Sequence, residues 1–79
     1  MDKVIEMLQT RQGTKSLNAF ANELGIWPST LWRYYRGERE MSTQVVKKLA
    51  RYFTARGDFD ALATLTAYAF GGVYDEESS

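Results

Sequence analysis

The side chains best suited to bind a ligand are those of the segment 28–36. Helical spacing places Leu31 and Tyr34 on one side of this segment, where they form an apolar face. The same spacing turns a mixed polar, aromatic and basic set outward, namely Ser29, Thr30, Trp32, Arg33 and Arg36. Guanidinium groups donate several hydrogen bonds to phosphates or to base edges, and exposed aromatic rings are typical of binding surfaces. The segment therefore predicts a short helix with one cationic side that projects outward.

The charge of the chain is concentrated in its middle, although the net charge is zero. Residues 11–56 carry nine basic and three acidic side chains, which gives +6, whereas residues 57–79 carry five acidic side chains and no basic one. A basic centre suits contact with phosphate, but a solvated helix face would have the same composition. We expect such a solvated face for Lys47, Lys48, Arg51 and Arg56.

The composition argues against an enzyme and against a metal site. The chain has no Cys and no His, which excludes disulfides, thiolate zinc sites and cysteine nucleophiles and removes the commonest general base. The carboxylate pairs Glu38/Glu40 and Asp58/Asp60 fall in loops and at a helix start, where solvation and capping explain them. We therefore expect no enzymatic activity, no metal and no cofactor.

No apolar run approaches the ~20 residues that a transmembrane helix needs. The first residues do not resemble a signal peptide, because Glu6 and Gln9 interrupt any apolar stretch. We expect a cytoplasmic, nucleoid-associated protein with no membrane partner.

Five helices are predicted from apolar periodicity and from capping and stop residues, and no segment alternates as a strand would. They run from Asp2 to Arg11, from the cap Ser16 to Gly25, over 28–36, from the cap Ser42 to Gly57, and from the cap Asp58 to Phe70. Pro28 suits the first position of the third helix, and Gly71-Gly72 is expected to break the fifth. These helices predict one domain over residues 1–72, followed by a short acidic tail over residues 73–79.

The fifth predicted helix is apolar nearly all round. In a small protein such a helix is buried on two sides, and one of these sides is expected to face another subunit. The candidates for this dimer interface are Phe59, Leu62, Leu65 and Phe70.

The stretch 24–37, Leu-Gly-Ile-Trp-Pro-Ser-Thr-Leu-Trp-Arg-Tyr-Tyr-Arg-Gly, joins two short helices through a tight turn. Ala21 is small enough for the third helix to cross close to the second, Gly25 supplies a positive φ, and Ile26 fills the corner. This stretch resembles the helix-turn-helix core of the Cro/phage-repressor (XRE) family. The resemblance covers about residues 16–53, with the motif at about 16–37.

The resemblance implies an all-α, compact five-helix, lambda-repressor-like domain with a central helix-turn-helix. It implies a sequence-specific regulator of transcription, repressor-like or Cro-like and of bacterial or phage type. Such a protein binds double-stranded DNA as a homodimer, with the helix 28–36 in the major groove.

Matching positions to the family also assigns the DNA contacts. The base-contacting residues would be Trp27, Pro28, Ser29, Trp32 and Arg33. Arg33 is the candidate for a bidentate contact with guanine O6 and N7. The phosphate-contacting residues would be Lys15, Ser16, Asn18, Thr30, Arg36, Arg39 and Gln44.

Three positions depart from the family pattern. Trp27 stands where the family has a small polar cap, Trp32 is large for a reading face, and Tyr35 replaces an acidic residue. Two alternatives therefore stay open. One is the antitoxin or accessory DNA-binding subunit of a two-gene module, which would also bind a protein partner. The other is a protein-interaction module that uses the surface of Trp27, Trp32 and Tyr35.

Overall fold

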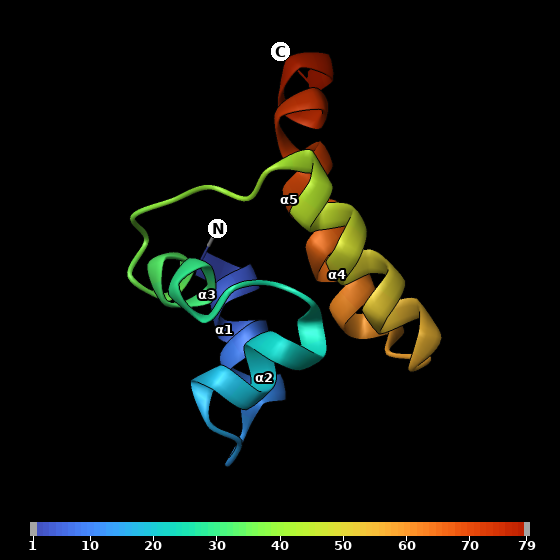
Figure 1. The fold of residues 1–79 in the computed structure, drawn as a ribbon. Helices are drawn as coiled ribbons and strands as arrows, with labels where there is room; N and C mark the ends of the chain where they lie inside the picture. Colours follow the sequence, from blue (N-terminus) through green and yellow to red (C-terminus); the bar gives the residue numbers. More distant parts are fainter. Residues whose placement is uncertain (1, 79) are drawn as a thin grey trace.

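The computed structural model describes the backbone of residues 2–78 and the side chains of residues 2–70. Within these limits the chain is all-helical (Figure 1). Its helices are α1 (Asp2–Gln12), α2 (Leu17–Leu24), α3 (Pro28–Tyr35), α4 (Thr43–Ala55) and α5 (Phe59–Ser78). This confirms the predicted small all-α domain of five helices. None of the helices in the described part is both long enough and apolar enough to cross a membrane.

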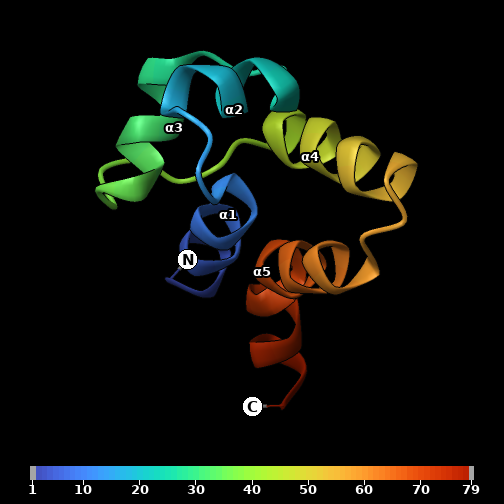
Figure 2. The ribbon, with the colours of Figure 1, turned by 90° about the horizontal axis from the view of Figure 1, so that it is seen from below.

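The helices form two groups around a single core. Figure 2 shows α2, α3 and α4 on one side of the molecule, with α1 and α5 on the other. Apolar side chains from every helix fill the space between the two groups, among them Leu8, Phe20, Leu31, Leu49, Phe53 and Leu65, each at most 1% exposed. α3 and the C-terminal end of α5 consequently lie on opposite sides of the molecule (Figure 2).

The predicted caps are present where three of the helices begin. Ser16 Oγ accepts a hydrogen bond from the Ala19 N–H at 3.1 Å, and Ser42 Oγ accepts one from the Val45 N–H at 3.3 Å. Asp58 Oδ1 accepts a hydrogen bond from the Ala61 N–H at 3.3 Å. These side chains satisfy N–H groups that have no partner within the first turn of a helix.

The end of the fifth helix was predicted wrongly. Gly71-Gly72 does not break α5, which continues from Phe59 to Ser78. Glycine costs a helix about 1 kcal/mol relative to alanine, but it can adopt helical dihedral angles. The predicted change from domain to acidic tail at residues 72–73 therefore falls within a helix, and the side chains of this stretch lie outside the described ones.

Leu65 was also predicted wrongly, as part of a dimer surface. Its side chain is 1% exposed and belongs to the core of the single chain. Leu65 comes two residues after Ala63 and six residues after Phe59, and both of these residues are exposed on the outer side of α5. On a helix with 3.6 residues per turn these spacings turn Leu65 away from that side.

Candidate nucleic-acid interface

A tight turn at Gly25 joins α2 to α3. Gly25 has φ +79° and ψ +27°, the left-handed conformation predicted for it. Its N–H donates to the Ala21 carbonyl at 3.0 Å, and the Ile26 N–H donates to the same carbonyl at 3.1 Å. Ala21 is fully buried, as expected for a small residue between two helices that pack closely. The turn thus fixes the direction in which α3 leaves α2.

Lys48 supports this turn from α4, a role that the sequence did not indicate. Its Nζ donates a hydrogen bond to the Gly25 carbonyl at 3.2 Å. The sequence assigned Lys48 to a solvated basic face, because spacing alone does not tell which loop the side of a helix will face. The contact links α4 to the residue that sets the start of α3.

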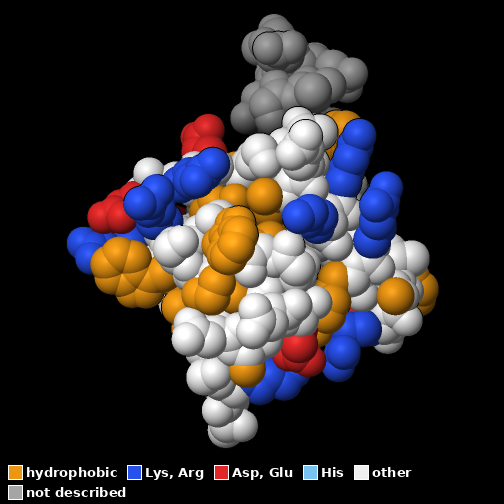
Figure 3. Space-filling model, viewed as in Figure 1, with side chains coloured by type: hydrophobic (Ala, Val, Ile, Leu, Met, Phe, Trp, Pro, Cys, Tyr) orange, Lys and Arg blue, Asp and Glu red, His pale blue; other side chains and the backbone are white. Residues whose placement is uncertain are grey.

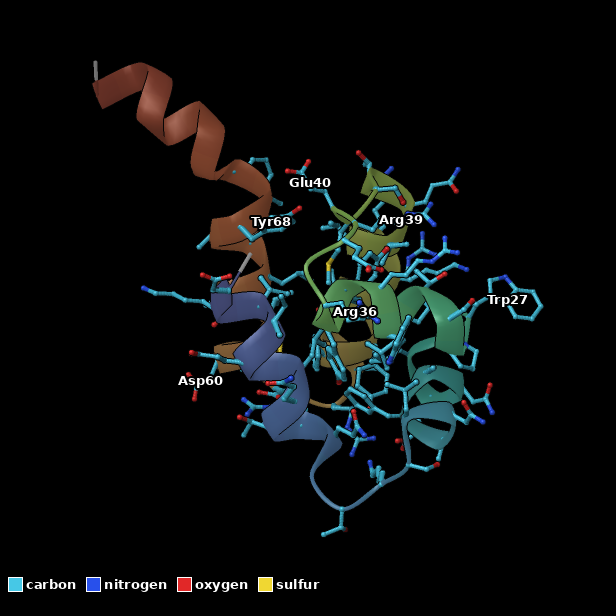
Figure 4. The ribbon with its side chains drawn as sticks, turned by 90° about the vertical axis from the view of Figure 1, so that its left-hand side faces the viewer. Trp27, Arg36, Arg39, Glu40, Asp60 and Tyr68 are labelled. Atoms are coloured by element: carbon cyan, nitrogen blue, oxygen red, sulfur yellow. The ribbon has the colours of Figure 1, made fainter. Side chains whose placement is uncertain are left out.

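Trp27 is the N-cap of α3 and makes no side-chain cap hydrogen bond, as expected for a large aromatic residue in place of a small polar one. Pro28 occupies the start of the helix, and the Trp27 carbonyl accepts hydrogen bonds from the N–H groups of Thr30 and Leu31. The Trp27 ring is 78% exposed and points away from the body of the protein (Figure 4). The ring is therefore available to a binding partner.

One side of α3 is open to solvent and the other is buried. Leu31 and Tyr34 are at most 1% exposed, as predicted. The exposed side carries Ser29, Trp32, Arg33 and Arg36, whereas Pro28 and Thr30 are half-buried at its margins. α3 ends at Tyr35, one residue earlier than predicted, with Arg36 as its C-cap. The outward face expected from the spacing is present and is not covered by the protein's own body.

Trp32, Arg36 and Glu38 form a small cluster on this face. The Arg36 guanidinium lies over the Trp32 ring at 4.5 Å from its centroid. Arg36 Nε is 3.3 Å from Glu38 Oε1. Arg36 therefore touches an aromatic ring and a carboxylate of its own chain, although the family resemblance assigned it to phosphate.

Three of the predicted phosphate contacts come together beside α3. Thr30, Arg39 and Gln44 line an open hollow of about 560 Å³, together with Trp27, Ser42 and Lys48. The hollow lies where α3, the loop after it and the start of α4 meet. Tyr68 of α5 anchors this loop, since its hydroxyl accepts a hydrogen bond from the Met41 N–H at 3.3 Å. Polar and cationic groups that surround an open hollow are suited to an anionic group.

Three more of the predicted phosphate contacts, Lys15, Ser16 and Asn18, lie at the start of α2, away from this hollow. Lys15 Nζ is 2.8 Å from Glu23 Oε2, so its charge is paired at the surface. Ser16 caps α2 with its hydroxyl, and Asn18 is exposed. The structure thus places the predicted phosphate contacts in two groups, and Arg36 belongs to neither.

Tyr35 does not share a surface with the two tryptophans. Its ring is half-buried, and its hydroxyl donates to Gln12 Oε1 of α1 at 2.8 Å. Burial raises the pKa of Tyr35 to about 12. The aromatic surface that the interaction-module alternative requires is therefore reduced to Trp27 and Trp32.

On the face seen in Figure 3, groups of Lys and Arg side chains lie over the loop that follows α3 and over α4. Among the described side chains, Arg33 and Arg39 have no carboxylate within ion-pair distance. Arg11, by contrast, forms a bidentate ion pair with Asp58, and the shorter of its two N–O distances is 2.6 Å. Arg33 on the exposed side of α3 and Arg39 in the loop after it thus keep their charge available to an anion, unlike Arg36, which lies beside Glu38.

The outer side of α5 is an apolar stripe. It consists of Phe59, Leu62, Ala63, Thr66, Ala67 and Phe70. Phe59 is 66% exposed and Phe70 is 53% exposed, while the four residues between them are smaller or partly buried. Three of the four predicted dimer residues, Phe59, Leu62 and Phe70, therefore lie on this stripe.

Comparison with known proteins does not assign the chain to a family: no protein-family model, no curated protein and no solved structure matches it. What this chain does must therefore be inferred from its own residues and their geometry.

Proposed function

We propose that the chain is a sequence-specific regulator of transcription of the Cro/phage-repressor type, which binds double-stranded DNA through α3. The observation that carries this proposal is the exposed side of α3, where Ser29, Trp32 and Arg33 project from a helix whose other side is locked into the core. An α-helix with its side chains is about 10–12 Å in diameter, close to the width of about 12 Å of the major groove. The exposed side of α3 can therefore enter the groove.

The surroundings of α3 support the same mode of binding. Phosphates border the major groove on both sides, and protein contacts to them fix the register of the reading helix. The hollow lined by Thr30, Arg39 and Gln44 lies on one side of α3, and the start of α2 offers Ser16 and Asn18. In this arrangement Arg33 donates to guanine O6 and N7, while the flanking groups hold the backbone.

A fluorescence anisotropy titration tests the role of Arg33. Duplexes selected by the protein from a random-sequence pool should bind with an affinity that falls steeply with salt, because neutralised phosphates release counterions. Arg33→Ala should weaken binding to the selected duplex by about 5- to 150-fold, the range that corresponds to about 1–3 kcal/mol of base discrimination, and should weaken random duplexes much less.

Lys3→Ala is the matched control, since Lys3 is an exposed cation of α1, a helix that carries none of the predicted DNA contacts. It should leave both affinities nearly unchanged. If Arg33→Ala lowers the affinity for selected and random duplexes equally, Arg33 does not read bases. If no duplex is enriched and no binding is seen at low salt, the proposed function is wrong.

A homodimer completes this proposal, with the apolar stripe of α5 as its interface. In an antiparallel pair of α5 helices, Phe59 would face Phe70 of the second copy, and Leu62 would face Ala67. Large side chains thus meet small ones near the centre, so the helices can pack about 8–10 Å apart. A two-fold pair is also the usual arrangement on a palindromic operator, with half-sites about 34 Å apart.

Sedimentation equilibrium tests the dimer. Thr66→Glu places a charge in the middle of the stripe and should convert the dimer to a monomer, since an unpaired charge is costly to bury. Thr54→Glu makes the same change at an exposed position of α4 and should leave the dimer intact. A wild-type chain that sediments as a monomer at high micromolar concentration would exclude this interface.

A protein partner is the second candidate, and the 78% exposure of Trp27 is the observation that favours it. Exposed tryptophans are frequent hot spots of protein interfaces. Trp27→Ser should leave DNA affinity nearly unchanged if the ring serves a protein, and should lower that affinity if it serves DNA. The same anisotropy titration separates the two roles.

A further inference from the structure

We propose that Arg36 and Glu38 are positioning residues for Trp32, and that Trp32 recognises the methyl group of a thymine in the major groove. This inference rests on the proposed function, and it names a base that the reading helix selects. It also gives Arg36 a different task from the phosphate contact that the sequence suggested.

The geometry of the cluster restrains the indole ring. Trp32 and Arg36 are four residues apart, so both lie on the same side of α3. The guanidinium carbon of Arg36 lies over the ring at 4.5 Å from its centroid, within the range of a cation–π interaction. The ring is therefore covered on one side and half-exposed at 47%, with less freedom than a tryptophan that stands alone.

Glu38 in turn holds Arg36, and the backbone holds Glu38. The Glu38 carboxylate lies 3.3 Å from Arg36 Nε. The Glu38 N–H donates to the Arg33 carbonyl at 3.0 Å, so the loop stays close to the last turn of α3. The chain Glu38–Arg36–Trp32 thus runs from a fixed backbone position to the ring.

Trp27 provides the internal contrast. It is 78% exposed, and no described cation lies over its ring. A restrained ring loses less conformational entropy on binding than a free one. Of the two tryptophans, Trp32 is therefore the one prepared for specific recognition.

The chemistry of the ring selects the base. An indole presents an apolar edge and a single N–H donor. In the major groove the apolar group is the C5 methyl of thymine, whereas adenine, guanine and cytosine present hydrogen-bonding atoms there. Arg36, with its charge offset by Glu38, contributes little to phosphate binding in this arrangement.

The first test uses the free protein and needs no DNA. In a Trp27→Phe background Trp32 is the sole tryptophan, so its fluorescence reports its own exposure. Arg36→Gln removes the covering guanidinium and should increase quenching by acrylamide, a neutral quencher, and Glu38→Gln should do so to a smaller extent. Arg39→Gln is the matched control and should have no effect. Equal quenching in all variants would overturn the positioning role.

The second test exchanges thymine for uracil, one position at a time, in a duplex selected by the protein. Uracil lacks only the methyl group, whose burial corresponds to about a fourfold change in affinity. At one position of each half-site the exchange should weaken the wild type about fourfold and leave Trp32→Ala unaffected. An exchange that has no effect at any position, or an equal effect in both proteins, would overturn the recognition of thymine.

The salt dependence separates the two roles of Arg36. As a positioning residue, Arg36→Gln should weaken selected duplexes more than random ones and leave the salt slope nearly unchanged. As a phosphate contact, it would reduce the slope by about one unit and weaken all duplexes alike, which would contradict the proposal. If the selection enriches no duplex, the proposed function fails together with the recognition of thymine, and the quenching result still decides whether Arg36 and Glu38 position the ring.

Discussion

Replacing Gly25 by alanine isolates the contribution of one backbone conformation to the turn before α3. Gly25 has φ +79°, and a Cβ placed there would meet no other atom within 4 Å. Steric conflict with the surroundings is therefore absent, and the cost comes from the residue's own backbone. For an L-residue the left-handed conformation costs about 1–2 kcal/mol. The unfolded chain has lower entropy with alanine than with glycine, which offsets this cost by about 0.4–1 kcal/mol.

The free energy of unfolding should thus fall by about 1 kcal/mol, which lowers Tm by roughly 4–8 °C in a domain of this size. Urea unfolding followed by circular dichroism at the helix bands measures the change. Gly57 is the matched control, because it has φ +69° and equally open surroundings but does not adjoin α3. Gly57→Ala should cost about as much as Gly25→Ala. Gly25→Asn should cost less, because asparagine tolerates the left-handed region better.

The two alanine variants should lose the same stability, because each loses only the glycine's backbone freedom. The turn before α3 should keep its shape, so the folded fraction of Gly25→Ala should bind DNA as tightly as the wild type. A loss well above about 3 kcal/mol at Gly25, with a small loss at Gly57, would refute this reasoning. Such a result would mean that the turn tolerates no side chain for reasons other than its dihedral angles.

Three further predictions concern the core and the ionisable contacts. Ala21→Leu should lower the free energy of unfolding in urea by about 1–3 kcal/mol because Ala21 is fully buried, while Ala19→Leu at an exposed position of α2 should be nearly neutral. Hydrogen bonds from Arg11 hold the pKa of Asp58 below 3.8, so this pair stabilises the fold above that pH and the stabilisation is lost as the pH falls. In Asp58→Asn the free energy of unfolding should therefore fall less steeply as the pH is lowered through the acid range. Burial raises the pKa of Tyr35 from 10.0 to about 12, so the neutral hydroxyl stabilises the fold below pH 10 and this contribution is lost as the pH rises toward 12. Tyr35→Phe should remove this alkaline loss of stability and should cost about 1 kcal/mol at neutral pH, where the hydrogen bond to Gln12 is lost. If stability falls at high pH in the variant as it does in the wild type, the assignment is contradicted.

Local signals predicted most of the fold. Side-chain caps at Ser16, Ser42 and Asp58 and the glycine that ends α2 act within one turn of helix, so the sequence alone reveals them. The division of α3 into a buried and an exposed side follows from its 3.6-residue period. The end of α5 was missed because glycine weakens a helix without forbidding it, and neighbouring residues decide the outcome.

The contacts that join different helices were not predictable from spacing. Lys48 reaches the Gly25 carbonyl across 23 residues, and Arg11 reaches Asp58 across 47. Tyr35, which one alternative placed on an interaction surface, is half-buried and donates a hydrogen bond to Gln12 of α1, 23 residues away. Leu65 was assigned to an interface because a helix that is apolar all round does not show which side the core takes. Each of these depends on the packing of whole helices.

The central claim is that the exposed side of α3 enters the DNA groove, and tethered cleavage tests it most directly. Because the chain has no cysteine, Ser29→Cys and Asp60→Cys each create one attachment point for an iron chelate that cuts nearby DNA. Asp60 projects on the other side of the molecule from Trp27 (Figure 4). On a selected duplex, the chelate at position 29 should cut at a few base pairs within each half-site, and the chelate at position 60 should not cut. Cleavage from position 60, or none from position 29 when the duplex is bound, would contradict the account.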